Sequence, residues 1–133
     1  MKILPRIARL LLVLWAGSLW SLLWVAAVLF HLLNDRHLAG SLAARFFQIE
    51  TYLGLAVAAL ALVLPGRTRY FWAYFAAALL AVNEWILKRV MHAAQVHGTA
   101  AGLSFGAWHG VSALLYVIAC LAVLVLVWNE DFR

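Results

Sequence analysis

The sequence predicts an all-α integral membrane protein, a bundle of four transmembrane helices that forms a single domain over residues 1–133. Of its 133 residues, 68% are hydrophobic and 11% are charged, whereas soluble domains are about half apolar and about a quarter charged. Four stretches reach the roughly 20 mostly apolar residues that a spanning helix needs. The alternation of apolar and polar residues that is typical of membrane-spanning β-strands does not occur. A helical bundle with the bilayer as its solvent is therefore expected.

The four predicted helices cover residues 7–33, 41–64, 68–96 and 103–128. The segments between them carry turn-forming or charged residues, which end helices; they are Asn34-Asp35-Arg36, Pro65-Gly66-Arg67 and His97-Gly98-Thr99. The apolar run of the first helix continues to Leu33, whereas a signal peptide has a short apolar core followed by a cleavage site. We therefore interpret this run as a retained span.

Basic residues lie next to the ends of the predicted helices, where the excess of Lys and Arg on one side indicates the cytoplasmic side. The termini and the second loop hold six of them: Lys2, Arg6, Arg9, Arg67, Arg69 and Arg133. The first and third loops with their flanks hold four: Arg36, Arg45, Lys88 and Arg89. This distribution predicts that both termini are cytoplasmic. Because no basic cluster with interleaved aromatic residues lies outside the spans, nucleic-acid binding is not expected.

With this orientation, all five histidines fall in the outer half of the bundle. Ionisable side chains inside membrane spans are costly, and they usually mark a functional site or a paired structural site. The predicted outer half supplies these candidate ligand-binding residues: His31, Glu50, Asn83, Glu84, His109, Ser112 and Tyr116. Three of them, His109, Ser112 and Tyr116, recur at three- and four-residue spacing, which places them on one face of the last helix.

Structural roles for the same residues stay open. Glu84 and Lys88 are four residues apart in the order that favours an ion pair within one helix. Arg45 lies close enough in sequence to pair with Glu50, and Asn83 suits a hydrogen bond between helices. A buried histidine such as His109 is more often a structural hydrogen-bonding group than a ligand.

Two common site motifs of fixed spacing do not occur in the sequence. It has no His-Glu-x-x-His and no phosphate-binding loop. A transition-metal or haem site would need histidines from separate helices, of which His31 and His109 are the candidate pair. No nucleophile–base pair is evident, so an enzyme is not expected.

Small residues define one face of several predicted helices and are candidates for close helix packing. These residues are Gly17 and Ser21 in the first helix, Gly54 in the second, and Gly102, Gly106 and Gly110 at the start of the fourth. We expect these faces to meet inside the bundle or to mediate association into a homo-oligomer or a larger membrane complex.

Several segments resemble a known family. The first helix contains Leu-Trp-Ala-Gly-Ser-Leu-Trp at 14–20 and ends near Val28-Leu29-Phe30, with Ala39-Gly40 after it. Arg-Phe-Phe occupies 45–47, and Phe-Gly-Ala-Trp-His-Gly-Val-Ser occupies 105–112. Together these segments resemble domain of unknown function 4149, the transmembrane protein 205-like family of small four-helix membrane proteins from bacteria and eukaryotes. Family members often carry proline at the positions of Ala27 and Val90, so the helix kinks that such prolines would cause are not expected here.

Three functions follow as hypotheses for a protein that we expect in the bacterial inner membrane. The first is the handling or transport of a ligand or metal through the outer cluster of His, Glu and Asn residues. The second is a non-catalytic accessory or assembly subunit of a larger membrane complex. The third is a b-type haem protein that uses His109 and one further histidine.

Overall fold

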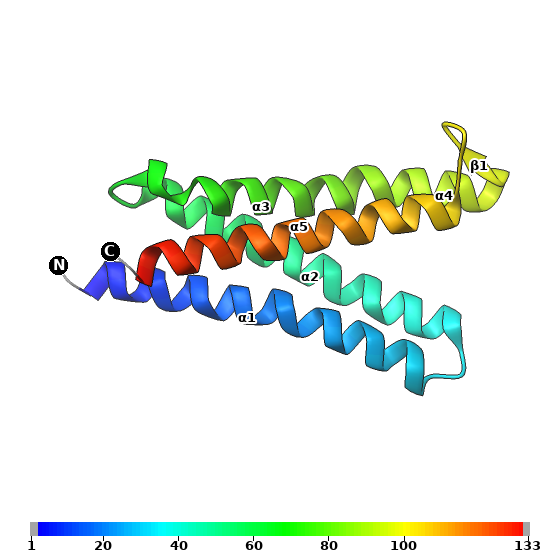
Figure 1. Ribbon diagram of the computed structural model, residues 1–133, viewed down its shortest axis with the longest axis horizontal. Helices are drawn as coiled ribbons and strands as arrows, with labels where there is room; N and C mark the ends of the chain where they lie inside the picture. The colour runs from blue at the N-terminus through cyan, green and yellow to red at the C-terminus, as the bar shows by residue number, and fades with distance from the viewer. Residues whose placement is uncertain (1–2, 132–133) are drawn as a thin grey trace.

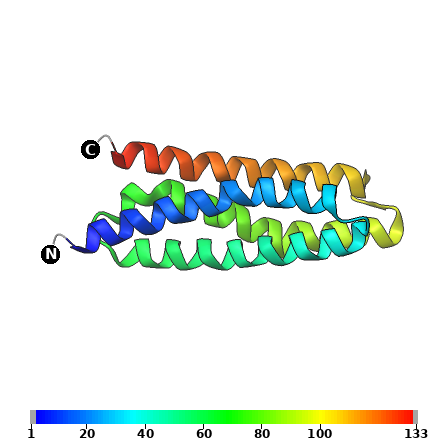
Figure 2. The same cartoon turned by 90° about the horizontal axis from the view of Figure 1, so that it is seen from below.

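The computed structural model describes residues 3–131, with the backbone alone at residues 130 and 131. It is an all-α bundle of four long helices (Figures 1 and 2). The elements are α1 (Ile3–Leu32), α2 (Arg36–Val63), a third helix built from η1 (Arg67–Tyr70), α3 (Phe71–Val82), η2 (Asn83–Leu87) and α4 (Lys88–His97), and α5 (Phe105–Asp131). All four helices are long and apolar enough to cross a membrane. The predicted four-helix transmembrane bundle is confirmed.

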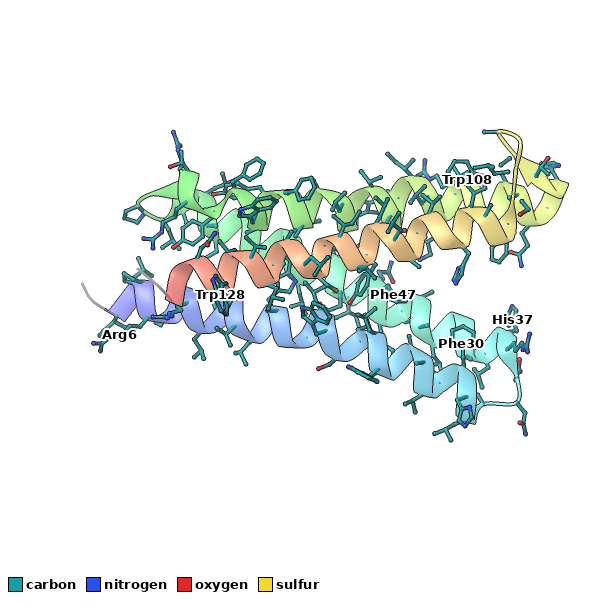
Figure 3. All side chains as sticks on the ribbon, viewed as in Figure 1. Arg6, Phe30, His37, Phe47, Trp108 and Trp128 are labelled. Atoms are coloured by element: carbon teal, nitrogen blue, oxygen red, sulfur yellow. The ribbon has the colours of Figure 1, made fainter. Side chains whose placement is uncertain are left out.

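The helices form a closed ring of contacts, in which α1 packs on α2, α2 on α3, α3 on α5 and α5 on α1. Helix α1 begins and α5 ends at the same end of the bundle, which we call the termini end (Figure 1). The opposite end, which we call the far end, carries the α1–α2 turn and a short hairpin of β1 (Thr99–Ala100) and β2 (Leu103–Ser104). In Figure 3, Arg6 and Trp128 mark the termini end, and His37 marks the far end.

Helix α2 begins earlier than the predicted residue 41 because Asp35 caps it. The Asp35 carboxylate accepts hydrogen bonds from the backbone N–H groups of His37 and Leu38, at 3.0 and 3.1 Å. A side chain that accepts these otherwise unpaired N–H groups stabilises a helix start. His37, expected in a loop, therefore lies in the first turn of α2.

The last long helix begins at Phe105, two residues after the predicted start, because Leu103 and Ser104 pair with the preceding strand. Gly102 has a φ of +80°, a left-handed conformation that favours glycine in a turn. The indole N–H of Trp108 donates to the Ala100 carbonyl at 2.8 Å and fastens the hairpin to α5. Gly102 consequently lies in the hairpin turn, outside the helix on which it was expected.

The main cluster of buried apolar side chains occupies the half of the bundle toward the termini end. The last buried residue of α1 is Leu22, and the first buried residue of α5 is Tyr116. Beyond them α1 and α5 diverge toward the far end (Figure 1), and Trp24 is 74% exposed. The pair α1–α2 and the pair α3–α5 therefore pack together at the termini end and separate toward the far end.

Candidate functional site

Glu50 is a buried ionisable residue near the midpoint of α2, with 5% of its surface exposed. The hydroxyl of Ser18, near the midpoint of α1, donates a hydrogen bond to Oε1 of the Glu50 carboxylate. The other oxygen, Oε2, is buried and has no hydrogen-bond partner among the residues that the structure describes. Because a buried polar atom without a partner is rare in native proteins, Oε2 is the principal candidate for contact with a ligand.

Helix α5 closes this region from the third side. The Tyr116 ring packs edge-on against Phe47 of α2, with ring centroids 4.9 Å apart; Phe47 lies near the middle of the bundle in Figure 3. The Tyr116 hydroxyl donates to the Leu19 carbonyl of α1 at 2.6 Å. Helices α1, α2 and α5 thus meet at one level, and we call Ser18, Glu50, Thr51 and Tyr116 at this level the Glu50 site.

Each hydroxyl group of the Glu50 site donates its hydrogen bond to an acceptor other than Oε2. Ser18 donates to Oε1, Thr51 donates to the Phe47 carbonyl at 3.0 Å, and Tyr116 donates to Leu19. The indole N–H of Trp15, on α1, is buried without a partner, and its ring packs against Gly54 one turn further along α2. The site therefore presents an unpaired acceptor, and its hydroxyls supply no donor to it.

The alternative pairing of Glu50 with Arg45 is not made. Arg45 is exposed on α2, and the described part of the chain contains no ion pair between the two residues. Glu84, in contrast, accepts from the Lys88 ammonium with an Nζ–Oε1 distance of 2.8 Å. The two acids within the spans therefore differ: Glu84 has a basic partner and Glu50 has none.

Asn83 and Ser112 form a reciprocal pair between the third helix and α5. The Asn83 amide donates to the Ser112 carbonyl at 3.2 Å, and the Ser112 hydroxyl donates to the Asn83 side-chain oxygen at 2.5 Å. The hydrogen bond between helices that was expected of Asn83 is present. Ser112 lies one turn of α5 from Tyr116, on the side of the far end.

The histidines do not gather at this site. His109 is exposed on α5 and stacks near Phe105, with ring centroids 6.1 Å apart. His31 is exposed at the end of α1 and lines an open depression of about 450 Å³ to which α1 alone contributes. Among the described residues, no three His, Cys, Asp or Glu side chains are grouped so that they could hold a metal ion. Among the described residues, no hydrogen bond or ring contact joins His31 and His109, and the pairing of these two histidines at a metal or haem stays a prediction.

Among the predicted packing residues, Gly54 makes the close approach. A Cβ atom at Gly54 would come within 2.9 Å of Cζ2 of Trp15. A Cβ atom at Gly17 or Gly110 would meet nothing within 4 Å, and one at Gly106 would meet only the Ser104 hydroxyl, at 4.0 Å. Ser21 is exposed. The Gly102, Gly106 and Gly110 series therefore does not pack against another helix of this chain.

Sequence reasoning missed Ser18 because it placed the face of Gly17 and Ser21 inside the bundle. The buried residues of α1 recur at three- and four-residue spacing, namely Leu12, Trp15, Ala16, Leu19 and Leu22. Ser18 lies beside this series, whereas Gly17 and Ser21 lie on the exposed side. The spacing of these large apolar residues was the available signal for the buried face, because the more apolar face of a helix often packs inside a protein. In a membrane, however, both faces of the helix are apolar.

The fold and the site define a class, an all-α membrane-protein bundle with a buried acid at its centre. No protein-family model, curated protein or solved structure matches the chain. The relationship to domain of unknown function 4149 therefore stays a prediction from the motifs.

Proposed function

We propose that this chain is a non-enzymatic membrane protein that binds a cationic or proton-donating ligand at Glu50, as a component of a transport system. The observation that carries the proposal is the buried Oε2 atom of Glu50, which has no hydrogen-bond partner in the described part of the chain. A buried carboxylate without a full set of partners is costly in an apolar interior. A ligand that brings a positive charge or a proton removes that cost.

A purely structural role explains Glu50 less well. Asn83 and Ser112, in the same bundle, satisfy each other through two hydrogen bonds, and Glu84 has Lys88. These three side chains therefore have polar partners inside the bundle. Glu50 differs from Glu84 in that its second oxygen is buried without a partner in the described part of the chain, which is the arrangement expected where that oxygen serves a ligand.

The position of Glu50 also supports transport. It lies near the midpoint of α2, as Ser18 does of α1, and ligand sites of transporters lie near the middle of the bilayer. Packing between α1 and α5 ends at Leu22 and Tyr116, next to the Glu50 site. We further infer that the protein lies in the bacterial inner membrane with its termini in the cytoplasm, so that the far end faces outward.

Thermal unfolding of the detergent-purified chain tests the proposal. The probes are Na⁺, K⁺, Zn²⁺, methylammonium and the proton, the last supplied as a pH series. A ligand that binds only the folded state raises the midpoint temperature as its concentration rises. We expect at least one probe to shift the wild-type midpoint, and the shift to be lost in Glu50→Gln.

Glu84→Gln is the matched control, because it removes the other acid within the spans and leaves the Glu50 site intact. It should keep the probe-dependent shift. If no probe, including the proton, distinguishes wild type from Glu50→Gln, Glu50 is not a ligand site and the proposal is wrong.

A further inference from the structure

We propose that the ligand of Glu50 is a proton, which Oε2 takes up from water at the far end of the bundle and returns to it. This inference rests on the proposed function and specifies the ligand of the same site. In the uptake step, a hydronium ion transfers a proton to Oε2. One O–H bond of the hydronium ion breaks, one O–H bond forms at Oε2, and water is left; no other bond changes. Release is the reverse step.

The donor and acceptor inventory of the site favours the smallest cation. The hydroxyls of Ser18, Thr51 and Tyr116 direct their protons to Oε1 of Glu50, to Phe47 and to Leu19. The Leu19 carbonyl is also within 3.8 Å of the Cys120 sulfur, which donates to it. A metal cation needs several oxygen atoms directed at it, whereas the carbonyls of this region already accept hydrogen bonds. A proton needs only Oε2.

Packing around the carboxyl points the same way. Thr51, Tyr116 and Cys120 are all buried, and the Phe47 ring lies against Tyr116. Side chains from three helices therefore surround Glu50. A proton adds no volume to such a site, while a hydrated or bare metal ion would have to displace these groups.

The charged and titratable groups that face Glu50 are few. Helix α5 presents Tyr116 and Cys120, both of which are buried and donate to the Leu19 carbonyl. Helix α1 presents Ser18 and no ionisable group at this level, and Arg45 of α2 is exposed. On α3, the ionisable residue is Tyr74, whose hydroxyl donates to the Arg67 carbonyl near the termini end. No basic side chain among them replaces a proton as the partner of Oε2.

A line of polar side chains on α5 leads from the far end to the Glu50 site. His109 is exposed near the start of α5, Ser112 lies about one turn further on, and Tyr116 follows after another turn. On the facing segment of α1, residues 23–32 are half-buried or exposed. The polar stripe on α5 therefore offers hydrogen-bonding side chains along which a proton from water at the far end reaches the site.

Two measurements on the full chain in detergent test the proton proposal. Dicyclohexylcarbodiimide is an apolar reagent that modifies a carboxyl group only in its protonated form, and peptide mass mapping locates the adduct. We expect labelling at Glu50 that slows as the pH rises, by about tenfold per pH unit once the carboxyl is mostly ionised. Infrared difference spectra between low and high pH should show the carbonyl stretch of a protonated carboxyl that is missing in Glu50→Gln.

The controls separate this inference from the proposed function. Glu84→Gln should keep both signals, and Glu50→Gln should match wild type in elution volume and helical circular dichroism. Two outcomes would overturn the proton assignment while keeping Glu50 as a ligand site. The first is that Na⁺ or K⁺ protects Glu50 from labelling at constant pH, and the second is a cation-dependent thermal shift without either proton signal. An infrared spectrum in which Glu50 does not change between low and high pH also overturns the assignment, even if the reagent fails to reach the carboxyl. Loss of the proton signals and of every thermal shift overturns both proposals.

Discussion

Gly54 shows how a single residue sets the distance between two helices. A Cβ atom there would lie 2.9 Å from Cζ2 of Trp15 and 3.2 Å from Cδ1 of Leu80. Both neighbours are buried, so neither can move aside freely in a densely packed interior. The absence of a side chain at Gly54 is therefore what lets α1 and α3 approach this part of α2, one turn from Glu50.

Replacing Gly54 with alanine should destabilise the bundle. The added methyl group overpacks the contact with Trp15, which costs about 1–3 kcal/mol, and the thermal midpoint in detergent should fall. Gly17→Ala is the control, because nothing lies within 4 Å of the new Cβ atom; it should be neutral or slightly stabilising, since glycine is unfavourable inside a helix. Equal midpoints for the two variants would contradict this account of the packing.

At the scale of elements, the third helix changes its hydrogen-bonding pattern where it meets α5. The segment Asn83–Leu87 is a π-helix between α3 and α4, and such insertions shift the side chains that follow relative to a regular helix. Asn83, the first residue of the π-helix, bonds Ser112 of α5 in both directions. The π-helix thus begins at the residue that pairs with Ser112, and Ser112 lies one turn of α5 before Tyr116.

A double-mutant cycle measures the strength of the Asn83–Ser112 pair. Asn83→Ala and Ser112→Ala should each destabilise the protein, and the double variant should lose less than the sum of the two. We expect a coupling free energy of about 0.5–1.5 kcal/mol, the range for polar pairs between transmembrane helices. Unfolding by a denaturing detergent supplies the free energies of unfolding. Additive effects would show that the side chains of the two residues do not stabilise each other.

For the whole molecule, the asymmetry between the two ends is the main feature. The packed core lies toward the termini end, and α1 and α5 diverge toward the far end (Figure 1). Six of the ten basic residues belong to the termini and the second loop, which favours the cytoplasm for that side. In the orientation that we propose, the divergent half of the bundle faces the periplasm.

Reporter fusions in a bacterial host test this orientation. A reporter that is active only in the cytoplasm should work when fused after Arg133. One that is active only in the periplasm should work when inserted between Ala101 and Gly102, in the exposed hairpin turn of the far end. The reverse pattern of activities would place the far end in the cytoplasm, and uptake of a proton from outside would then be excluded.

By itself, the sequence determined the number, order and approximate bounds of the helices, because the length of an apolar run is a local property. It also allowed the Glu84–Lys88 ion pair as one of two roles for Glu84, since both residues lie on one helix four positions apart, and the structure shows this pair. Glu50 is different: its partner Ser18 is on another helix, 32 positions away. Only the tertiary structure decided that α1 turns Ser18, and not Gly17 or Ser21, toward α2. In a membrane every face of a helix can be apolar, so hydrophobicity does not specify the inward face; close packing between helices does.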